Sequence, residues 1–188
     1  VKPGDKVKVG QLIGKAGGFV SAPIYASVSG TVKKINQAVA SSGRLMQTVV
    51  IESDGEQTLL EELHPPKLDT MQDFLDAVRE SGLVGLGGAG FPTVVKLTVK
   101  NLEQVKAVII NGAECEPYIT SDTRTMLDRS QEVLEGARLV QHFLQVKRVI
   151  FAIEDNKPVC IRTYRKLVKN EQGMEVCALK SLYPQGGE

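Results

Sequence analysis

The feature that most constrains the fold is a regular alternation of strand-like and helical segments from residue 105 onward. Residues 105–111 and 148–153 are apolar runs of strand length, typical of strands buried on both faces of a sheet, and residues 174–179 are expected to form a third strand. Residues 123–144 and 157–169, which separate them, have helical spacing. Strands alternating with helices of this length predict a parallel sheet covered by helices, here a Rossmann-like α/β domain. The buried side of the first helix is expected at Leu127, Val133, Leu134, Ala137, Leu139 and Val140.

The first 53 residues have a different pattern, in which short β-type runs are separated by glycine-containing turns such as Ser29-Gly30. Strands are expected at residues 6–9, 31–36 and 47–52. The stretch VKPGDKVKVGQLIG, followed by AP and SGTVKKI, resembles the biotinyl and lipoyl carrier domains, which fold as a flattened β-sandwich. The sequence has no lysine between Lys15 and Lys33, where a carrier would present its modified side chain. A structural module of barrel-sandwich type is therefore favoured over a carrier.

A linker is expected at residues 54–68, because its two consecutive prolines remove backbone donors and disfavour helix before them. A helix should follow, with Asp69 as its N-cap, Gln72 at the capping-box position and Gly82 at its end. We thus expect an all-β module at residues 1–53, a linker at 54–68 and a ligand-binding α/β domain at 69–188. The start at Val1, without an initiator methionine, indicates a fragment of a longer protein.

Composition narrows the possible functions. With 42% hydrophobic residues, 24% charged residues and a net charge of +1, the chain fits a folded globular protein and lacks the positive field that nucleic-acid binding needs. It has no apolar run of about 18 residues and no signal peptide, so a cytoplasmic location is expected. The three cysteines are widely separated, which favours reduced thiols over disulfides or a zinc site. We expect no metal site.

A glycine-rich loop, GLGGAGFPTVVK, runs from Gly85 to Lys96. It satisfies the G-x-G-x-x-G pattern, but a helix precedes it where the dinucleotide-binding fingerprint requires a strand. Its glycines leave backbone amides open to a planar ring or a phosphate, Pro92 could begin a short helix, and Lys96 adds a positive charge. Taken alone, the loop is explained equally well as a flexible connector.

Two further motifs follow expected strands. NGAECEPY occupies residues 111–118, and YPQGGE occupies residues 183–188. The carboxyl edge of a parallel sheet is where ligand sites usually form. The three motifs are therefore predicted to converge on one cleft.

The series SGLVGLGGAGFPTVVK, NGAECEPY and YPQGGE resembles the flavin- and NADH-binding 51 kDa subunit of respiratory complex I. Over nearly the whole chain, and more closely, it resembles the C subunit of the Rnf electron transport complex. This resemblance implies an NADH-dependent oxidoreductase module that passes hydride from NADH to FMN, and electrons on to [4Fe-4S] clusters. The sequence has no C-x-x-C run, so the resemblance places such clusters in a C-terminal part of the subunit that is not included in this sequence. Further implications are partner subunits in an ion-translocating membrane complex and a peripheral position on its cytoplasmic face.

The resemblance also implies roles for individual residues. FMN contacts are implied for Gly85, Gly87, Gly88, Lys96, Asn111, Glu114, Cys115, Tyr183 and Gly186. NADH contacts are implied for Phe91, Glu116 and Glu188, because an aromatic ring can stack on adenine and carboxylates can accept hydrogen bonds from ribose. Four positions depart from the complex I pattern and weaken the expectation for NADH more than that for FMN: Leu86, Val99, Ala113 and Gly187. No catalytic side chain is implied, because the cofactor carries the chemistry.

Other interpretations stay open. The A subunit of the sodium-pumping NADH:quinone reductase shares this plan as a flavin-free docking protein, although the intact glycines favour a flavin. Cys115 could be an inert small residue. Glu114, Glu116 and Asp122 could form a solvated acidic edge or ligands of a hard metal ion, although carboxylates without a fixed geometry are weak evidence for a metal.

Overall fold

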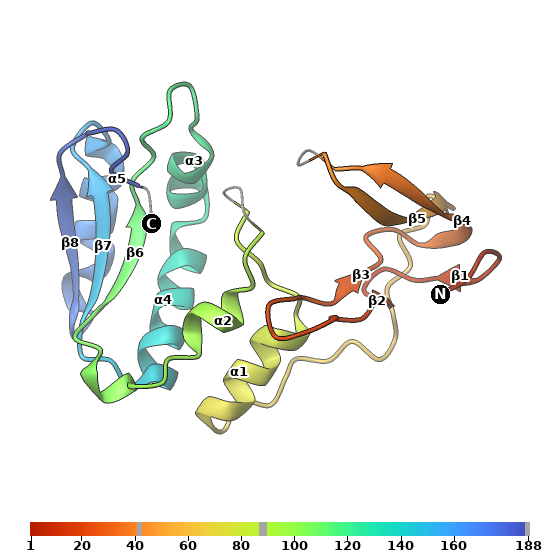
Figure 1. The fold of residues 1–188 in the computed structure, drawn as a ribbon. Helices are drawn as coiled ribbons and strands as arrows, with labels where there is room; N and C mark the ends of the chain where they lie inside the picture. Colours follow the sequence, from red (N-terminus) through yellow and green to blue (C-terminus); the bar gives the residue numbers. More distant parts are fainter. Residues whose placement is uncertain (41–42, 87–89, 187–188) are drawn as a thin grey trace. The chain divides into compact units, whose positions relative to one another are not determined.

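The computed structural model describes residues 1–40, 43–86 and 90–186 and forms two compact units, Val1–Val99 and Lys100–Glu188 (Figure 1). The expected boundaries at residues 53/54 and 68/69 stay a prediction. Each unit has its own sheets and its own buried residues.

The first unit begins with an all-β module of two antiparallel sheets, ordered β1-β4-β5 and β2-β3. A small core of Val7, Ala26 and Val32 lies between them. The expected strands are confirmed in place, but their lengths differ: the first is shorter because Val9 forms only an isolated bridge to Leu59. The strands are β1 (Lys6–Val7), β2 (Leu12–Gly14), β3 (Ile24–Tyr25), β4 (Gly30–Val39) and β5 (Leu45–Ser53).

Two helices complete the first unit, α1 (Met71–Glu80) and α2 (Thr93–Leu97). The expected N-cap at Asp69 is wrong by one residue. The cap is Thr70, whose hydroxyl accepts from the Asp73 amide at 3.1 Å while the Asp73 carboxylate accepts from the Thr70 amide at 2.8 Å. Both candidate pairs have the same three-residue spacing, so spacing alone could not separate them. Gly82, with φ +69°, follows the helix end as expected.

The second unit is built on three parallel strands in the order β6-β7-β8. This confirms the expected parallel sheet with helices, while the finer Rossmann-like assignment stays a prediction. The elements are β6 (Val108–Gly112), β7 (Val149–Glu154), β8 (Met174–Leu179), α3 (Ser121–Asp128), α4 (Ser130–Leu144), α5 (Pro158–Leu167) and the short 3-10 helices η1 (Leu102–Gln104) and η2 (Val168–Asn170).

Three expectations about this unit are wrong. The single helix expected at residues 123–144 is two helices, α3 and α4, separated at Arg129, whose φ of −125° and ψ of 34° are not helical. Leu139, expected on the buried side, is exposed. The first strand is not buried on both faces either, because Ile109 on the edge strand β6 is 63% exposed, whereas the central strand β7 buries Phe151 and Ile153 completely.

Candidate functional site

A hollow of about 350 Å³ lies at the carboxyl edge of the β6-β7-β8 sheet. Its walls come from the segments that follow each strand: residues 114–120 after β6, Glu154, Asn156 and Lys157 at the end of β7, and residues 181–183 after β8. Parallel α/β sheets usually present their ligands at this edge. The hollow is therefore the candidate functional site of the second unit.

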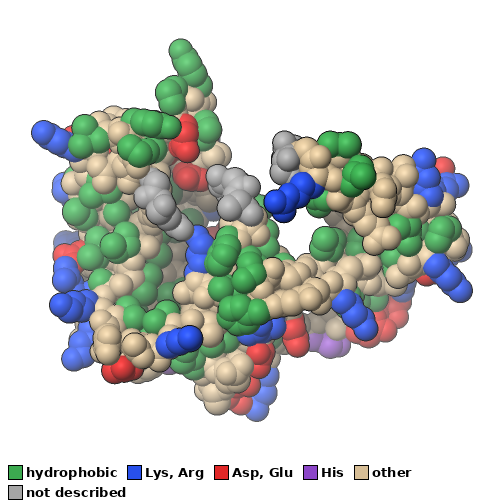
Figure 2. All heavy atoms as spheres, in the orientation of Figure 1, with side chains coloured by type: hydrophobic (Ala, Val, Ile, Leu, Met, Phe, Trp, Pro, Cys, Tyr) green, Lys and Arg blue, Asp and Glu red, His purple; other side chains and the backbone are tan. Residues whose placement is uncertain are grey.

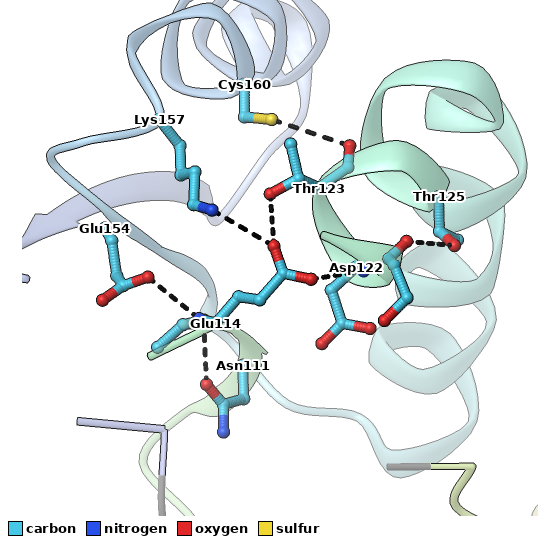
Figure 3. Close-up of polar contacts among 10 residues, drawn as sticks. Asn111, Glu114, Asp122, Thr123, Thr125, Glu154, Lys157 and Cys160 are labelled. Carbon is cyan, nitrogen blue, oxygen red and sulfur yellow. Dashed lines mark hydrogen bonds and ion pairs between the residues drawn. The ribbon is translucent and has the colours of Figure 1, made fainter. Parts of the chain in front are cut away.

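Glu114 is the most densely bonded residue of this hollow (Figure 3). Its carboxylate accepts hydrogen bonds from the Asp122 amide at 2.8 Å, the Thr123 hydroxyl at 2.6 Å and the Lys157 ammonium at 3.2 Å. Its own amide donates to the Glu154 carboxylate at 3.0 Å. These bonds hold the turn after β6, residues 113–120, against the start of α3, the end of β7 and the residue before α5.

The electrostatics of this cluster follow from its burial. The side chains of Glu114 and Lys157 are only 2% and 16% exposed. Burial alone would raise the pKa of the Glu114 carboxyl, but the hydrogen bonds from Thr123, the Asp122 amide and Lys157 more than offset it, so this pKa lies below its ordinary value. The pKa of Asp122 is raised, first by burial and then by the nearby carboxylates of Glu114 and Glu116. Glu114 is therefore an ionised anchor whose carboxylate is already occupied by the protein.

Asn111 joins the two strand-end motifs. Its side-chain oxygen accepts from the Ala113 amide at 3.1 Å, and its side-chain nitrogen donates to the Gly186 carbonyl, also at 3.1 Å. A Cβ on Gly186 would lie 2.7 Å from the Ala113 carbonyl oxygen, so glycine permits this close approach. The structure thus brings NGAECEPY and the start of YPQGGE together. Their contacts with FMN stay predictions.

Glu114, Cys115, Glu116 and Tyr183 all line the hollow, as does Tyr118. Cys115 is partly exposed, and the two tyrosines are largely exposed. These groups can contact a flat ring and accept hydrogen bonds from ligand hydroxyls. The described residues contain no group of three or more potential metal ligands.

The three cysteines, Cys115, Cys160 and Cys177, are free thiols, as expected. Cys160 is buried, and burial is the main reason why its pKa is raised. Within the described ranges, no helix is both long enough and apolar enough to cross a membrane.

The described ends of the glycine-rich loop pair with each other in the first unit. The Gly85 amide donates to the Phe91 carbonyl at 2.9 Å, and the Thr93 amide donates to the Leu83 carbonyl at 3.0 Å. A Cβ at Gly85 would meet only the Phe91 carbonyl oxygen, at 3.8 Å, so packing within the described residues does not require glycine there. Lys96 is the basic residue of the last turn of α2.

Some of the predicted site residues are not brought together. Gly87, Gly88 and Glu188 lie outside the described residues. Gly85, Phe91 and Lys96 belong to the first unit, and the remaining described site residues, all after residue 99, belong to the second. Convergence of all three motifs on one cleft therefore stays a prediction.

Sequence reasoning missed Thr123, Glu154, Lys157 and Ser181, all of which bond within the cluster or line the hollow. The one usable signal was the polar run from Glu154 to Lys157, which comes directly at the end of an apolar strand. Nothing in the sequence distinguished Thr123 from the polar residues around it.

Models of two protein families match the chain. The model of the Nuo51 FMN-binding domain matches residues 78–188, and that of the RnfC barrel sandwich hybrid domain matches residues 1–56. The second match confirms the expected barrel-sandwich module. The first confirms that the α/β part is of a flavin-binding type.

Curated relatives match over the length of the chain. The chain is 41% identical over 193 residues to the C subunit of the Na⁺-translocating ferredoxin:NAD⁺ oxidoreductase complex of Acetobacterium woodii, covering 100% of the chain and 43% of that relative. It is 41% identical over 191 residues to the C subunit of the proton-translocating ferredoxin:NAD⁺ oxidoreductase complex of Clostridium ljungdahlii, covering 100% of the chain and 42% of that protein.

The C subunit of an ion-translocating oxidoreductase complex of Haemophilus influenzae is 38% identical over 191 residues, covering 99% of the chain and 29% of the relative. The chain thus spans less than half the length of these relatives. With a family model matched over most of its residues, the chain belongs to the Nuo51 FMN-binding domain family and is similar throughout to the C subunits of ion-translocating oxidoreductase complexes.

Proposed function

We propose that this chain is the flavin-binding part of the C subunit in an Rnf-type, ion-translocating oxidoreductase complex. The observation that carries this proposal is the match of the Nuo51 FMN-binding domain to residues 78–188. Two relatives are named as parts of ferredoxin:NAD⁺ oxidoreductase complexes, which supports a nicotinamide nucleotide as the second redox partner. The electrons would pass between that nucleotide and FMN by hydride transfer, and then to iron–sulfur clusters in other parts of the complex.

Several described residues fit a bound flavin. A Cβ at Gly85 would make a single ordinary contact within the described residues, with the Phe91 carbonyl oxygen at 3.8 Å, so a flat ring or a phosphate can approach its backbone. In the second unit the Glu114 carboxylate is fully engaged by the protein, which supports a role for the backbone of Glu114 and Cys115 in holding the ligand. Asn111 and Gly186, fixed to each other, and Tyr183 would complete the contacts. Gly87, Gly88 and Lys96 are proposed as further FMN contacts.

The flavin, when bound, supplies both two-electron and one-electron chemistry, so the side chains need only hold the reactants in place. Phe91, Glu116 and Glu188 are proposed as contacts of the nicotinamide nucleotide. Alignment of the two rings is then the main contribution of the protein to the rate.

The domain division and the location belong to the same proposal. Residues 1–53 would form the barrel-sandwich module, 54–68 the linker and 69–188 the FMN- and NADH-binding domain. Other subunits of the complex would hold this part at the cytoplasmic face of the membrane.

Flavin titration tests the proposal directly. Added to the 188-residue chain, FMN should lose fluorescence at about micromolar concentrations, as expected for a specific site. Gly85→Val should weaken FMN binding by about tenfold or more, because the side chain occupies the space needed by the ring or phosphate. Gly17→Val is the matched control. A Cβ at Gly17 meets nothing within 4 Å, so the fold tolerates a side chain there at least as well as at Gly85, and Gly17 lies between β2 and β3, outside the glycine-rich loop.

Unchanged FMN fluorescence would contradict the proposal and favour the flavin-free docking role. Electron transfer is measured separately, with NADH and an artificial acceptor. Acceptor reduction should require added FMN. Reduction at the same rate without FMN would contradict the flavin's role.

A further inference from the structure

The turn after β6 contains a tyrosine in an unfavourable backbone conformation. The Ile119 amide donates to the Glu116 carbonyl at 3.4 Å, and Tyr118 has φ +67°. Pro117 fixes a negative φ at the first central position, so the positive φ at the second defines a type II β-turn. Glycine or asparagine normally occupies that second position, because a side chain there is strained.

Packing does not explain the tyrosine either. Tyr118 is fully exposed, at 104% of its reference area, so its ring buries no apolar surface. Glycine would fit the same backbone without strain and without leaving a large ring in water. Fold stability therefore gives no reason for an aromatic residue at this position.

The ring has a defined location. Tyr118 and the largely exposed Tyr183 line the same hollow, although one follows β6 and the other follows β8. Figure 1 shows the segment between β6 and α3 projecting beyond the edge of the sheet, and Figure 2 shows hydrophobic side chains at the end of this projection. Two exposed aromatic rings at one hollow can contact a flat ligand ring.

The charges of the hollow narrow the class of ligand. Three glutamates and one lysine line it: Glu114, Glu116, Glu154 and Lys157. Lys157 is already paired with Glu114. An excess of carboxylates disfavours a diphosphate but suits a ring and ribose, whose hydroxyls can donate to Glu116.

We propose that Tyr118 stacks on the ring–ribose end of a nicotinamide nucleotide and determines part of the affinity for that substrate. This inference rests on the proposed function, to which it adds a substrate contact. The strained turn keeps the ring exposed where it lines the hollow, so a flat ligand can reach it. The Glu114 bonds fix the backbone two residues before this turn, so little ordering of the backbone is needed when the ligand binds.

The test is binding of NAD⁺ and NADH to the full 188-residue chain by calorimetry, with FMN present and absent. Tyr118→Gly should weaken nucleotide binding about fivefold through loss of stacking, while its melting temperature stays equal or rises because the strain is removed. Tyr118→Phe keeps the ring and should bind within about twofold of the unchanged protein. Gln145→Gly is the matched control, because Gln145 has a similar positive φ of 52° at the end of α4 but does not line the hollow.

The outcomes separate the two proposals. If FMN binds but Tyr118→Gly leaves nucleotide affinity unchanged, the stacking inference fails and the proposed function stands. If FMN does not bind but Tyr118→Gly still weakens nucleotide binding, the flavin proposal fails and the stacking role stands. Competition by nicotinamide mononucleotide or by AMP supports the inference and identifies which end of the nucleotide enters. The stacking inference is overturned if the protein without substitutions binds no nucleotide. It is also overturned if Tyr118→Phe binds nucleotide as weakly as Tyr118→Gly does.

Discussion

The glycine-rich loop and the turn after β6 both carry motifs of a flavin-binding family, yet they are built in opposite ways. The loop is closed by backbone hydrogen bonds at its two ends, and its one described side chain between them, Leu86, is 94% exposed. The turn after β6 has a buried carboxylate with three donors, and its backbone is bonded to Glu154. The first region offers open backbone, and the second offers fixed geometry. Each of these two properties, which a ligand site can use, is thus supplied by a different region of the chain.

The largest expected effect is on the stability of the second region. Lys157→Met removes one partner of a buried ion pair and leaves the Glu114 carboxylate without its counter-charge, so the free energy of unfolding should fall by about 3 kcal/mol. Urea unfolding of the protein and of the Lys157→Met variant measures this difference in the free energy of unfolding. The exposed Lys169→Met is the control and should change the value by less than about 0.5 kcal/mol.

A double variant separates charge from packing. With Glu114→Gln added to Lys157→Met, much of the lost stability should return, because the buried Glu114 charge is removed together with its partner. A single Lys157→Met variant as stable as the Lys169→Met control would show that the ion pair does not fix the turn.

Acid should weaken the second region in a way that depends on Glu114. The pKa of its carboxyl is lowered below the ordinary 4.5 in the folded protein, so its contribution to stability is complete above that value and is lost as pH falls through the folded pKa. Between about pH 5 and about pH 3, the unchanged protein should therefore lose more unfolding free energy than Glu114→Gln does. Equal losses in urea titrations at the two pH values would contradict the lowered pKa.

The smallest effect is expected in the glycine-rich loop. Gly85 has no positive φ, and an added Cβ meets nothing closer than 3.8 Å, so Gly85→Ala should leave the free energy of unfolding unchanged or raise it by up to about 1 kcal/mol. Thermal unfolding checks this. A loss of more than about 1 kcal/mol would mean that the loop is required by the fold and would remove the contrast between the two regions.

The sequence was sufficient to predict where the hollow of the second unit forms. The apolar runs located all three parallel strands, so the positions of Asn111 and Glu116 near the carboxyl edge followed from strand ends alone. It was not sufficient to predict burial within the sheet. An edge strand such as β6 and a central strand such as β7 are equally apolar, and only pairing order distinguishes Ile109, which is exposed, from Phe151, which is buried.

The bonds of the site were harder to predict than its position. Lys157 is one of 23 basic residues, and its partner lies 43 positions earlier in the chain, so no local pattern joins them. The strained turn at Tyr118 had a partial signal in the preceding proline, but a proline is equally compatible with a type I turn, which needs no positive φ. Both features depend on tertiary contacts or backbone angles that spacing does not encode.

The origin of the hollow's walls in three separate strand ends has a consequence for how such a protein can evolve. Each wall segment follows a different strand, whose register is set by hydrogen bonds inside the sheet. A substitution or insertion in one segment can therefore change which ligand fits the hollow while the paired strands keep their alignment. Selection could in this way adjust the ligand preference of a lineage one wall at a time, without requiring a new fold.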